Sequence, residues 1–280
     1  MMPALAPSRR TFLTGALGAG LAACAPSGLS LTPTARPYMG KLGVQLYTVR
    51  SLFEADFSGT LAALAKIGYQ DCETAGYFDH DPREVKAALD VVGMVSNAAH
   101  IRLPELRDGF DRQLEYAAIM GQKSIYLGWI PPEERTADNY RALSDLLNER
   151  GAAAKAAGLQ LGYHNHEFEF FDLGATNGYD ILLDRTDASL VAMEIDFFWA
   201  AEAGIDARRL FDRAPGRFTS CHIKDRMTDG SMVPVGDGII DFAGLLAETQ
   251  KAGLKTFYVE HDNPDNALES VKRSYAHLTS

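Results

Sequence analysis

The segment LGYHNHEFEF, residues 161–170, places two histidines, His164 and His166, inside a stretch whose other residues are typical of a strand. Side chains alternate between the two faces of a strand, so Gly162, His164 and His166 are expected to share one face. Two imidazoles on one face can bind a metal ion or transfer protons. The alternative is a pair of hydrogen-bonded histidines at the edge of a sheet.

Further reactive side chains stand at the ends of other apolar runs. With His164 and His166 they include five of the seven histidines, and they are Gln45, Tyr47, Glu73, His100, Asp196, His222, Lys224, Glu260 and His261. Imidazoles and carboxylates that converge from separate strands suit a mixed nitrogen and oxygen metal site, for Mn, Co, Fe, Zn or Ni rather than Ca. Asp196 directly follows an apolar run, where a buried unpaired carboxylate is costly, so a functional role is expected for it.

Several of these residues also have a structural interpretation. His222 in CHIKD could be a hydrogen-bonded core histidine, and Glu260 could form an ion pair with Lys224. Glu73 could pair with Arg50 or Arg102. Aromatic residues near the strand ends are typical of a core, although a ring at a rim can also stack on a sugar; these are Tyr47, Trp129, Phe197, Phe198 and Trp199.

The elements that position these residues alternate along the chain from Lys41 onward. Strands are expected over 42–47, 70–75, 94–100, 123–128, 159–166, 190–196, 218–224 and 256–261, and helices over 58–68, 82–93, 109–121, 139–158, 175–186, 205–214, 241–253 and 264–278. This alternation predicts an α/β fold, a single (β/α)8 TIM barrel over residues 41–280, in which the reactive residues meet at the carboxyl ends of the strands. An open doubly wound sheet is the alternative, but no glycine-rich phosphate loop follows the first strand.

The N-terminus predicts export. Residues 8–13, SRRTFL, place paired arginines before the run TGALGAGLAA, as in a twin-arginine signal, and this run is too short to span a bilayer. The run ends in LAAC, which resembles a bacterial lipobox with Cys24 as the lipidated first residue, and ordinary cleavage is the alternative. We expect a signal peptide over 1–23, a tether over 24–40, and a periplasmic protein whose membrane contact is a lipid on Cys24.

Charge and cysteine content narrow the function further. The formal net charge is −10, and loss of residues 1–23 removes two arginines and no acid, which makes it −12. A nucleic-acid partner needs a basic surface, so this balance argues against one. Cys72 and Cys221 both lie in apolar strand-like runs and are expected to be core thiols rather than a disulfide.

From Lys41 onward the chain resembles the xylose-isomerase-like barrel superfamily, also called the sugar phosphate isomerase/epimerase family. The segments that carry the resemblance are GVQLYTVR, GYHNHEFEF, MEIDFFWAAEAG, CHIKD with VGDGIIDF after it, and YVEHDNP. The resemblance implies one divalent metal ion (Mn, Co, Fe, Zn, Ni or Mg), held at the ends of strands five to eight, commonly by Glu, Asp, His and Glu. Asp196, His222 and Glu260 match the last three positions. His164 stands where the family has the first glutamate, and Glu167 is the alternative if a bulge turns it inward.

The resemblance also implies roles for the other rim residues. The metal would chelate a carbonyl oxygen and a neighbouring hydroxyl, His166 or Glu260 would remove the adjacent proton, and Lys224 would donate to the developing oxyanion. Hydroxyl groups and faces of the sugar would be bound by Tyr47, Glu73, His100 and Trp199. In related epimerases two glutamates exchange a proton across the substrate. Without the first glutamate, we expect a single base to remove the proton from one side of the substrate.

The expected substrate is a small carbohydrate that is not phosphorylated, because sugar phosphates belong to the cytoplasm. Isomerase or epimerase action on a sugar or keto-sugar, and lyase or hydratase action on a 3-keto-glycoside, both fit. A carbohydrate-binding lipoprotein without catalysis is an alternative. An abasic-site endonuclease is a more remote one, since such enzymes share the fold but need a basic groove.

Overall fold

The structure is a computed structural model that describes residues 42–280 of the 280-residue chain. The predicted signal peptide (1–23), Cys24 and the tether (24–40) lie outside the described residues. Within 42–280, none of the helices combines the length and the apolar character that a bilayer span requires.

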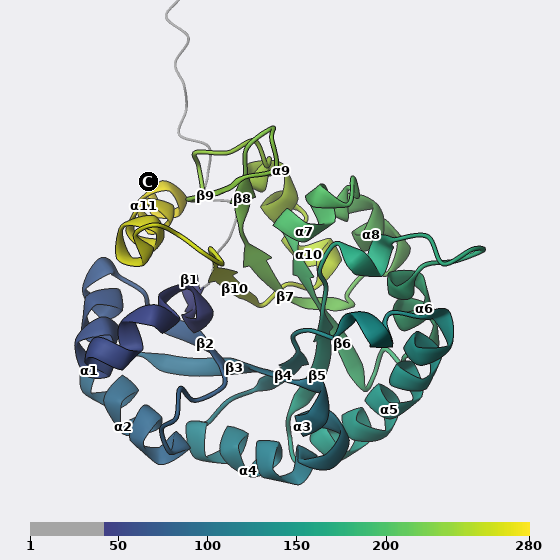
Figure 1. Cartoon of the computed structure of the whole chain (residues 1–280), viewed down its shortest axis with the longest axis horizontal. Coiled ribbons are helices and arrows are strands. Elements are labelled where there is room, and N and C mark those ends of the chain that lie inside the picture. The colour runs from purple at the N-terminus through teal and green to yellow at the C-terminus, as the bar shows by residue number, and fades with distance from the viewer. Residues whose placement is uncertain (1–41) are drawn as a thin grey trace, which may run out of the picture. The chain divides into compact units, whose positions relative to one another are not determined.

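Parallel strands form a closed barrel (Figure 1). They are β1 (Leu42–Gln45), β2 (Asp71–Ala75), β3 (Val95–Ile101), β4 (Ser124–Leu127), β5 (Gln160–His164), β6 (Val191–Asp196), β7 (Phe218–Ile223) and β10 (Thr256–Val259). Strands adjacent in this series are adjacent in the barrel, and β10 closes it by pairing with β1. The predicted (β/α)8 TIM barrel is confirmed for this part of the chain.

Helices form the outer layer around the barrel (Figure 1). They are α1 (Arg50–Ile67), α2 (Pro82–Val92), α3 (Leu103–Asp108), α4 (Phe110–Met120), α5 (Ala137–Ala156), α6 (Gly178–Arg185), α7 (Phe197–Glu202), α8 (Ala207–Arg213), α9 (Phe242–Ala247), α10 (Thr249–Ala252) and α11 (Ala267–Thr279). Every predicted helical segment contains a helix, and the segment 241–253 is divided between α9 and α10. The sequence did not predict α3, α7 or the hairpin of β8 (Asp225–Arg226) and β9 (Met232–Val233), which all follow strand ends.

Strands β1, β5 and β10 each end two residues earlier than the sequence predicted, and two of these ends show the cause. After β1 the chain turns into a 3-10 helix at Leu46–Val49, and the side chain of Gln45 accepts a hydrogen bond from the backbone N–H of Tyr47. After β5 the backbone N–H of His166 donates to Glu169 Oε2 over 2.7 Å, which turns the chain into a second 3-10 helix at Phe168–Phe170. His166 therefore lies in a loop rather than in the strand.

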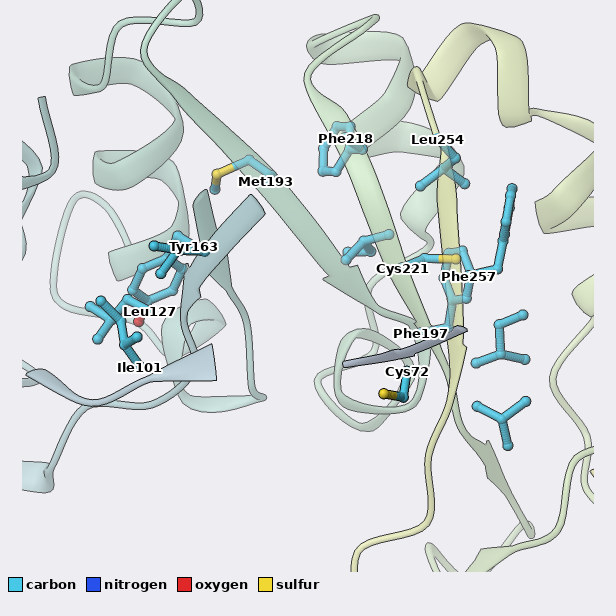
Figure 2. Packing of buried hydrophobic residues seen from close by; sticks show 14 of the residues in the cluster. Cys72, Ile101, Leu127, Tyr163, Met193, Phe197, Phe218, Cys221, Leu254 and Phe257 are labelled. Atoms are coloured by element: carbon cyan, nitrogen blue, oxygen red, sulfur yellow. The ribbon is translucent and has the colours of Figure 1, made fainter. Parts of the chain in front are cut away.

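Apolar side chains fill the layer between the barrel and the helices. Figure 2 shows two parts of it, one with Ile101, Leu127 and Tyr163 and another with Phe218, Cys221, Leu254 and Phe257. Each fully buried large apolar side chain stabilises the fold by about 1.5–3 kcal/mol. Cys72 and Cys221 are both buried and free, so the prediction of core thiols is confirmed.

Tyrosine rings fill the interior of the barrel below the strand ends. Tyr126 and Tyr258 are fully buried there, and the hydroxyl of Tyr126 lies 3.0 Å from Thr219 Oγ1. Glycines in the strands make room for both rings. A Cβ atom on Gly162 would lie 2.4 Å from the Tyr126 ring, and one on Gly43 would lie 2.5 Å from the Tyr258 ring. The polar residues of the strand ends therefore lie above a closed floor.

This packing predicts that Gly162→Ala lowers the free energy of unfolding by about 1–3 kcal/mol, because the added methyl group overpacks the interior against Tyr126. Urea denaturation measures the change. Gly109→Ala is the matched control, since its Cβ would meet only backbone atoms at 3.6 Å and its φ is −126°. Equal stability of the two variants would contradict the account of the barrel floor.

Candidate active site

Four consecutive strand ends bring the predicted metal ligands together. His164 ends β5, Asp196 ends β6, His222 precedes the last residue of β7, and Glu260 directly follows β10. His222 Nδ1 lies 2.7 Å from Glu260 Oε2, and Asp196 Oδ2 lies 3.9 Å from both His222 Nδ1 and His164 Nε2. Ligand atoms of Asp196, His222 and Glu260 all lie within 4.8 Å of one another.

A second layer of carboxylates lies against these histidines. Glu194 Oε2 is 3.1 Å from His164 Nδ1, and Glu73 Oε2 is 2.6 Å from His222 Nε2. His100 Nε2 joins the two acids, at 2.6 Å from Glu194 Oε2 and 3.1 Å from Glu73 Oε2. Both carboxylates are fully buried. Each proposed histidine ligand therefore directs one nitrogen toward a buried carboxylate and the other toward Asp196.

The sequence analysis missed Glu194. It lies two residues before Asp196 on the same inward face, so the alternation of β6 contained the signal that could have found it. Glu73 was predicted to bind a sugar hydroxyl, but its Oε2 is bonded to His222 and accepts from Gln45 Nε2 at 2.8 Å. A direct contact of Glu73 with a sugar stays a prediction.

The buried acids set the charge of the histidines. Burial acts to lower the pKa of His100, but Glu73 and Glu194 outweigh it and raise this pKa to about 9. Burial also acts to lower the pKa of His222, and Glu194 and Glu260 outweigh it and hold the value well above the usual range. Burial and the charge of His222 lower the pKa of His164 to about 3. His164 is therefore a neutral imidazole that can bind a metal ion directly, whereas His222 would release its second ring proton on binding one.

Lys224 supplies a further buried cation of the site. Its Nζ lies 3.0 Å from Asp196 Oδ2, 2.8 Å from Glu260 Oε2 and 2.9 Å from Asp262 Oδ1. Burial raises the pKa of Asp196 to about 6, although the charge of Lys224 acts in the opposite direction. The sequence suggested an ion pair of Glu260 with Lys224 as an alternative to a metal-binding role. The structure contains this ion pair, and Glu260 also contacts His222.

Arginine partners for Glu73, the other alternative from the sequence, are not found. Arg50 instead donates to the backbone oxygens of Tyr47 and Asp262, and Arg102 pairs with Glu105. His261 also lies apart from the site, because its Nδ1 is 2.8 Å from Ser270 Oγ on α11.

His166 lies at the edge of this cluster with its ring free of hydrogen bonds to the described residues. The ring stacks on Phe168 at 5.2 Å between centroids and lies 5.4 Å from the ring of Trp199. Its Nδ1 is buried and has no hydrogen-bond partner within residues 42–280. Burial, together with the neighbouring His164 and the cationic Lys224, holds the pKa of His166 well below its usual range. The ring is thus neutral.

The loop after β5 is fixed by Glu169 rather than by Glu167. Glu169 is fully buried, accepts from the hydroxyl of Tyr163 at 2.6 Å, and holds the backbone of His166. Glu167 begins the 3-10 helix and is only partly buried, without a bulge that turns it into the barrel. Of the two residues considered for the fifth strand, His164 is therefore the one that lies among the other proposed ligands.

A cleft of about 1070 Å³ opens above the cluster. Of the predicted site residues, its lining includes Tyr47, His100, His164, His166, Lys224 and Glu260. The ring of Trp199 lies 5.4 Å from Lys224 Nζ, but Trp199 and Glu73 do not belong to the lining. Contact of Trp199 with a sugar therefore stays a prediction.

Asp196, His222 and Glu260 form a mixed oxygen and nitrogen donor set that suits a divalent transition metal ion. A cation about 2.1 Å from each ligand requires ligand atoms no more than about 4.2 Å apart, and the 3.9 Å contacts of Asp196 Oδ2 with His222 and His164 meet this limit. His164 gathers within 4.8 Å with His100, Glu194 and His222 rather than with Glu260. Asp196 Oδ2 is buried, and its 3.0 Å contact with Lys224 Nζ is an ion pair without hydrogen-bond geometry. Histidine ligands also need a partner on the second ring nitrogen, and Glu194 and Glu73 provide it for His164 and His222.

Comparison with known proteins gives a family match and several relatives. The family model described as xylose isomerase-like TIM barrel matches residues 61–280. The chain is 26% identical to an inosose dehydratase from Geobacillus kaustophilus over 229 residues, which cover 67% of this chain and 74% of that protein. It is 22% identical to an inosose dehydratase from Geobacillus thermodenitrificans over 254 residues, which cover 77% of this chain and 85% of that protein.

Solved structures share the fold at lower identity. A sugar phosphate isomerase/epimerase from Parabacteroides distasonis superimposes with a TM-score of 0.76 at 23% identity, over 90% of this chain and 97% of that chain. The 3-keto-D-glucoside 4-epimerase of E. coli gives a TM-score of 0.65 at 17% identity, over 86% and 99%. The IOLI protein, whose structure holds a zinc atom, gives 0.63 at 19% identity, over 85% and 96%.

The buried Glu169 predicts a pH-dependent stability of the loop that carries His166. Burial raises the pKa of Glu169 from 4.5 to about 7. A carboxyl group with a raised pKa in the folded state contributes stability that is fully present below 4.5 and is lost as the pH rises through about 7. We expect Glu169→Gln to remove this dependence, so that the variant gains stability relative to the unmodified chain between these pH values.

Urea unfolding of both proteins from pH 4.5 to 8 tests the prediction. Glu167→Gln is the control, since this neighbouring side chain is partly exposed. A stability difference between Glu169→Gln and the unmodified chain that stays constant across the range would contradict the buried, titrating carboxyl group.

Proposed function

This chain belongs to the xylose isomerase-like TIM barrel family, and we propose that it is a divalent-metal-dependent enzyme that removes a proton beside the carbonyl group of a non-phosphorylated sugar or keto-sugar. The observation that carries the proposal is the position of an unbonded His166 beside the converging set of His164, Asp196, His222 and Glu260. His164, His166 and Glu260 line the inner end of a cleft large enough for a small-molecule substrate, and Asp196 and His222 contact this lining from below.

The donor residues and the base have separate tasks. A bound divalent ion supplies a Lewis acid that polarises a carbonyl oxygen and orients a neighbouring hydroxyl group. His164, Asp196, His222 and Glu260 would hold it, and Glu194 and Glu73 keep the two imidazoles in the orientation this requires. The ammonium of Lys224 lines the same cleft and stabilises negative charge that develops on the substrate oxygen.

Proton removal falls to His166 rather than to Glu260. Glu260 Oε2 is already engaged by His222 Nδ1 and by Lys224 Nζ, whereas the His166 ring makes no hydrogen bond to the described residues. His166 accepts the C–H proton, and the electron pair of that bond moves toward the carbonyl. Return of a proton from water to the opposite face of the same carbon gives epimerisation. Protonation of the former carbonyl carbon, with loss of the proton from the neighbouring hydroxyl group, gives isomerisation.

Elimination is the second outcome of the same first step. The electron pair forms a double bond to the next carbon, the bond from that carbon to an oxygen substituent breaks, and the departing oxygen takes up a proton to leave as water or an alcohol. The sequence relatives named inosose dehydratase support elimination, and the structural neighbour named 3-keto-D-glucoside 4-epimerase supports a keto-sugar. Lyase or hydratase action on a 3-keto-glycoside thus belongs to the proposal beside epimerisation.

We propose an exported enzyme. The support is the paired arginines Arg9 and Arg10, the short apolar run after them and the LAAC segment that ends at Cys24, all outside the described residues. In the periplasm the enzyme would meet sugars that carry no phosphate. A lipid on Cys24 would hold it at the membrane.

The proposed ligand set predicts that Asp196→Asn lowers the affinity for zinc by at least about 100-fold, since changes in residues that only orient metal ligands already cost about 10–100-fold. The variant keeps the acceptor oxygen for the backbone N–H of Trp199, so the fold is retained. Calorimetric titration of the metal-free protein with zinc measures the affinity. Asp262→Asn is the control, because Asp262 contacts Lys224 but lies outside the ligand set; equal affinity of both variants would contradict the assignment.

A base role predicts a different result for His166→Gln. Turnover of keto-sugars is expected to fall by about 10²–10⁴-fold, the usual contribution of a general base, while zinc content stays at the level of the unmodified chain. Metal analysis and assays on a panel of keto-sugars and 3-keto-glycosides measure the two quantities separately. His80→Gln, outside the cleft, controls for loss of a histidine; loss of zinc from the His166 variant would make His166 a ligand instead.

A further inference from the structure

The cleft extends from the metal ligands toward one side of the barrel only. Beyond the inner end, most of its lining comes from the loops after β2, β3 and β4 and from α3 and α4, including Tyr77, Phe78, Asp79, Arg107, Gln113, Tyr116, Trp129 and Glu134. The loop after β6, which continues into α7, contributes none of the lining residues. We call the part of the cleft over β2–β4, defined by these eight residues, the outer cleft.

The size of the cleft exceeds what one sugar ring fills. Its volume is about 1070 Å³, and sites of about 300–1,000 Å³ hold drug-sized ligands, which are much larger than a single pyranose. The proposed chemistry uses only the inner end, where His164, His166, Lys224 and Glu260 lie. The outer cleft therefore has room for a substantial group attached to the ring that reacts.

The walls of the outer cleft combine aromatic faces with polar edges. Trp129 is 48% exposed although it lines a cleft, and the rings of Tyr77 and Tyr116 meet edge to face at 5.3 Å between centroids. The amide of Gln113 has no side-chain hydrogen bond to any described residue. A sugar ring presents apolar C–H faces and hydroxyl edges, which match an aromatic surface with adjacent donors and acceptors.

The charges of the outer cleft favour a neutral ligand. Arg107 Nη1 lies 2.8 Å from Glu134 Oε1, and Arg102 pairs with Glu105, so both arginines are already compensated by carboxylates. Asp79 and Glu133 add further negative charge to the lining. A phosphate or carboxylate on the ligand would meet no free cation in this part of the cleft.

The loop after β2 is held in an unusual conformation at this wall. Phe78 and Asp79 have φ values of 53° and 63°, and they are the only non-glycine residues with positive φ among residues 42–280. The ring of Phe78 packs on Phe53 at 4.5 Å between centroids, which anchors the loop to α1. Backbone strain of this kind persists where the surrounding packing enforces it, and it concentrates at binding and catalytic sites.

We infer that the outer cleft is a subsite for a second sugar ring, so that the substrate is a neutral glycoside of at least two rings rather than a free monosaccharide. The inference depends on the proposed function in one respect, the assignment of the reacting ring to the inner end of the cleft. The reacting ring occupies the inner end, and the ring attached to it lies along Trp129 and Tyr116.

Calorimetric titration of the zinc-loaded protein tests this subsite with sugars that carry no keto group, and proton NMR of each sample afterwards checks that the reducing sugars have not isomerised. The panel is glucose, methyl glucoside, cellobiose, maltose and trehalose. At least one disaccharide is expected to bind about tenfold tighter than glucose. Trp129→Ala is expected to remove this difference in affinity, because the second ring then loses the aromatic surface on which it packs. Phe171→Ala is the matched control, because Phe171 is 54% exposed and lies outside the cleft.

Equal affinity for all five sugars would overturn the subsite, and so would an undiminished preference for the disaccharide in the Trp129 variant. Neither result depends on turnover. Failure of the proposed function would appear separately, as absence of reaction with keto-sugars by a protein that still prefers disaccharides.

Discussion

Two carboxylates buried inside the barrel, Glu73 and Glu194, are the constraint on which the site depends. An ionised carboxylate removed from water is costly unless it is paired and hydrogen-bonded. Here both acids contact His100 and His222, and Glu194 also contacts His164. The need to satisfy the acids therefore fixes the rotation of both rings. The nitrogens that remain are turned toward Asp196, where a cation can bind.

Lys224 compensates the negative charge of the acids at the mouth of the barrel. Its ammonium group lies between Asp196, Glu260 and Asp262, so three acids at the mouth of the barrel share one cation. The acids outnumber the cations there, which is the electrostatic condition that favours a divalent ion. Tyr126 and Tyr258 fill the interior of the barrel below the site, and the cleft above it extends over β2–β4.

The repeat of strands and helices was sufficient to predict the barrel. The polar strand ends then predicted that His164, His222 and Asp196 lie close together, because the carboxyl ends of all the strands meet at one mouth of such a barrel. Glu194 escaped because it lies inside an apolar run, and its role depends on the pairing of His164 with Glu194 between β5 and β6. The loop position of His166 depends on Glu169, and the outer cleft depends on α3 and on the loop at Phe78. Contacts between segments distant in sequence determine the role of Glu194 and the outer cleft, whereas the turn at His166 depends on a side chain three residues further along the chain.

Deuterium exchange tests the central claim most directly. The zinc-loaded protein and a chelator-treated sample would be incubated in D2O with a keto-sugar and a 3-keto-glycoside, and proton NMR would follow the C–H group beside the carbonyl. The account predicts that this proton is replaced by deuterium, or lost with elimination, in the zinc-loaded sample and persists in the chelated one. Persistence of the proton in both samples, with zinc bound in the first, would contradict carbon-acid catalysis at this site.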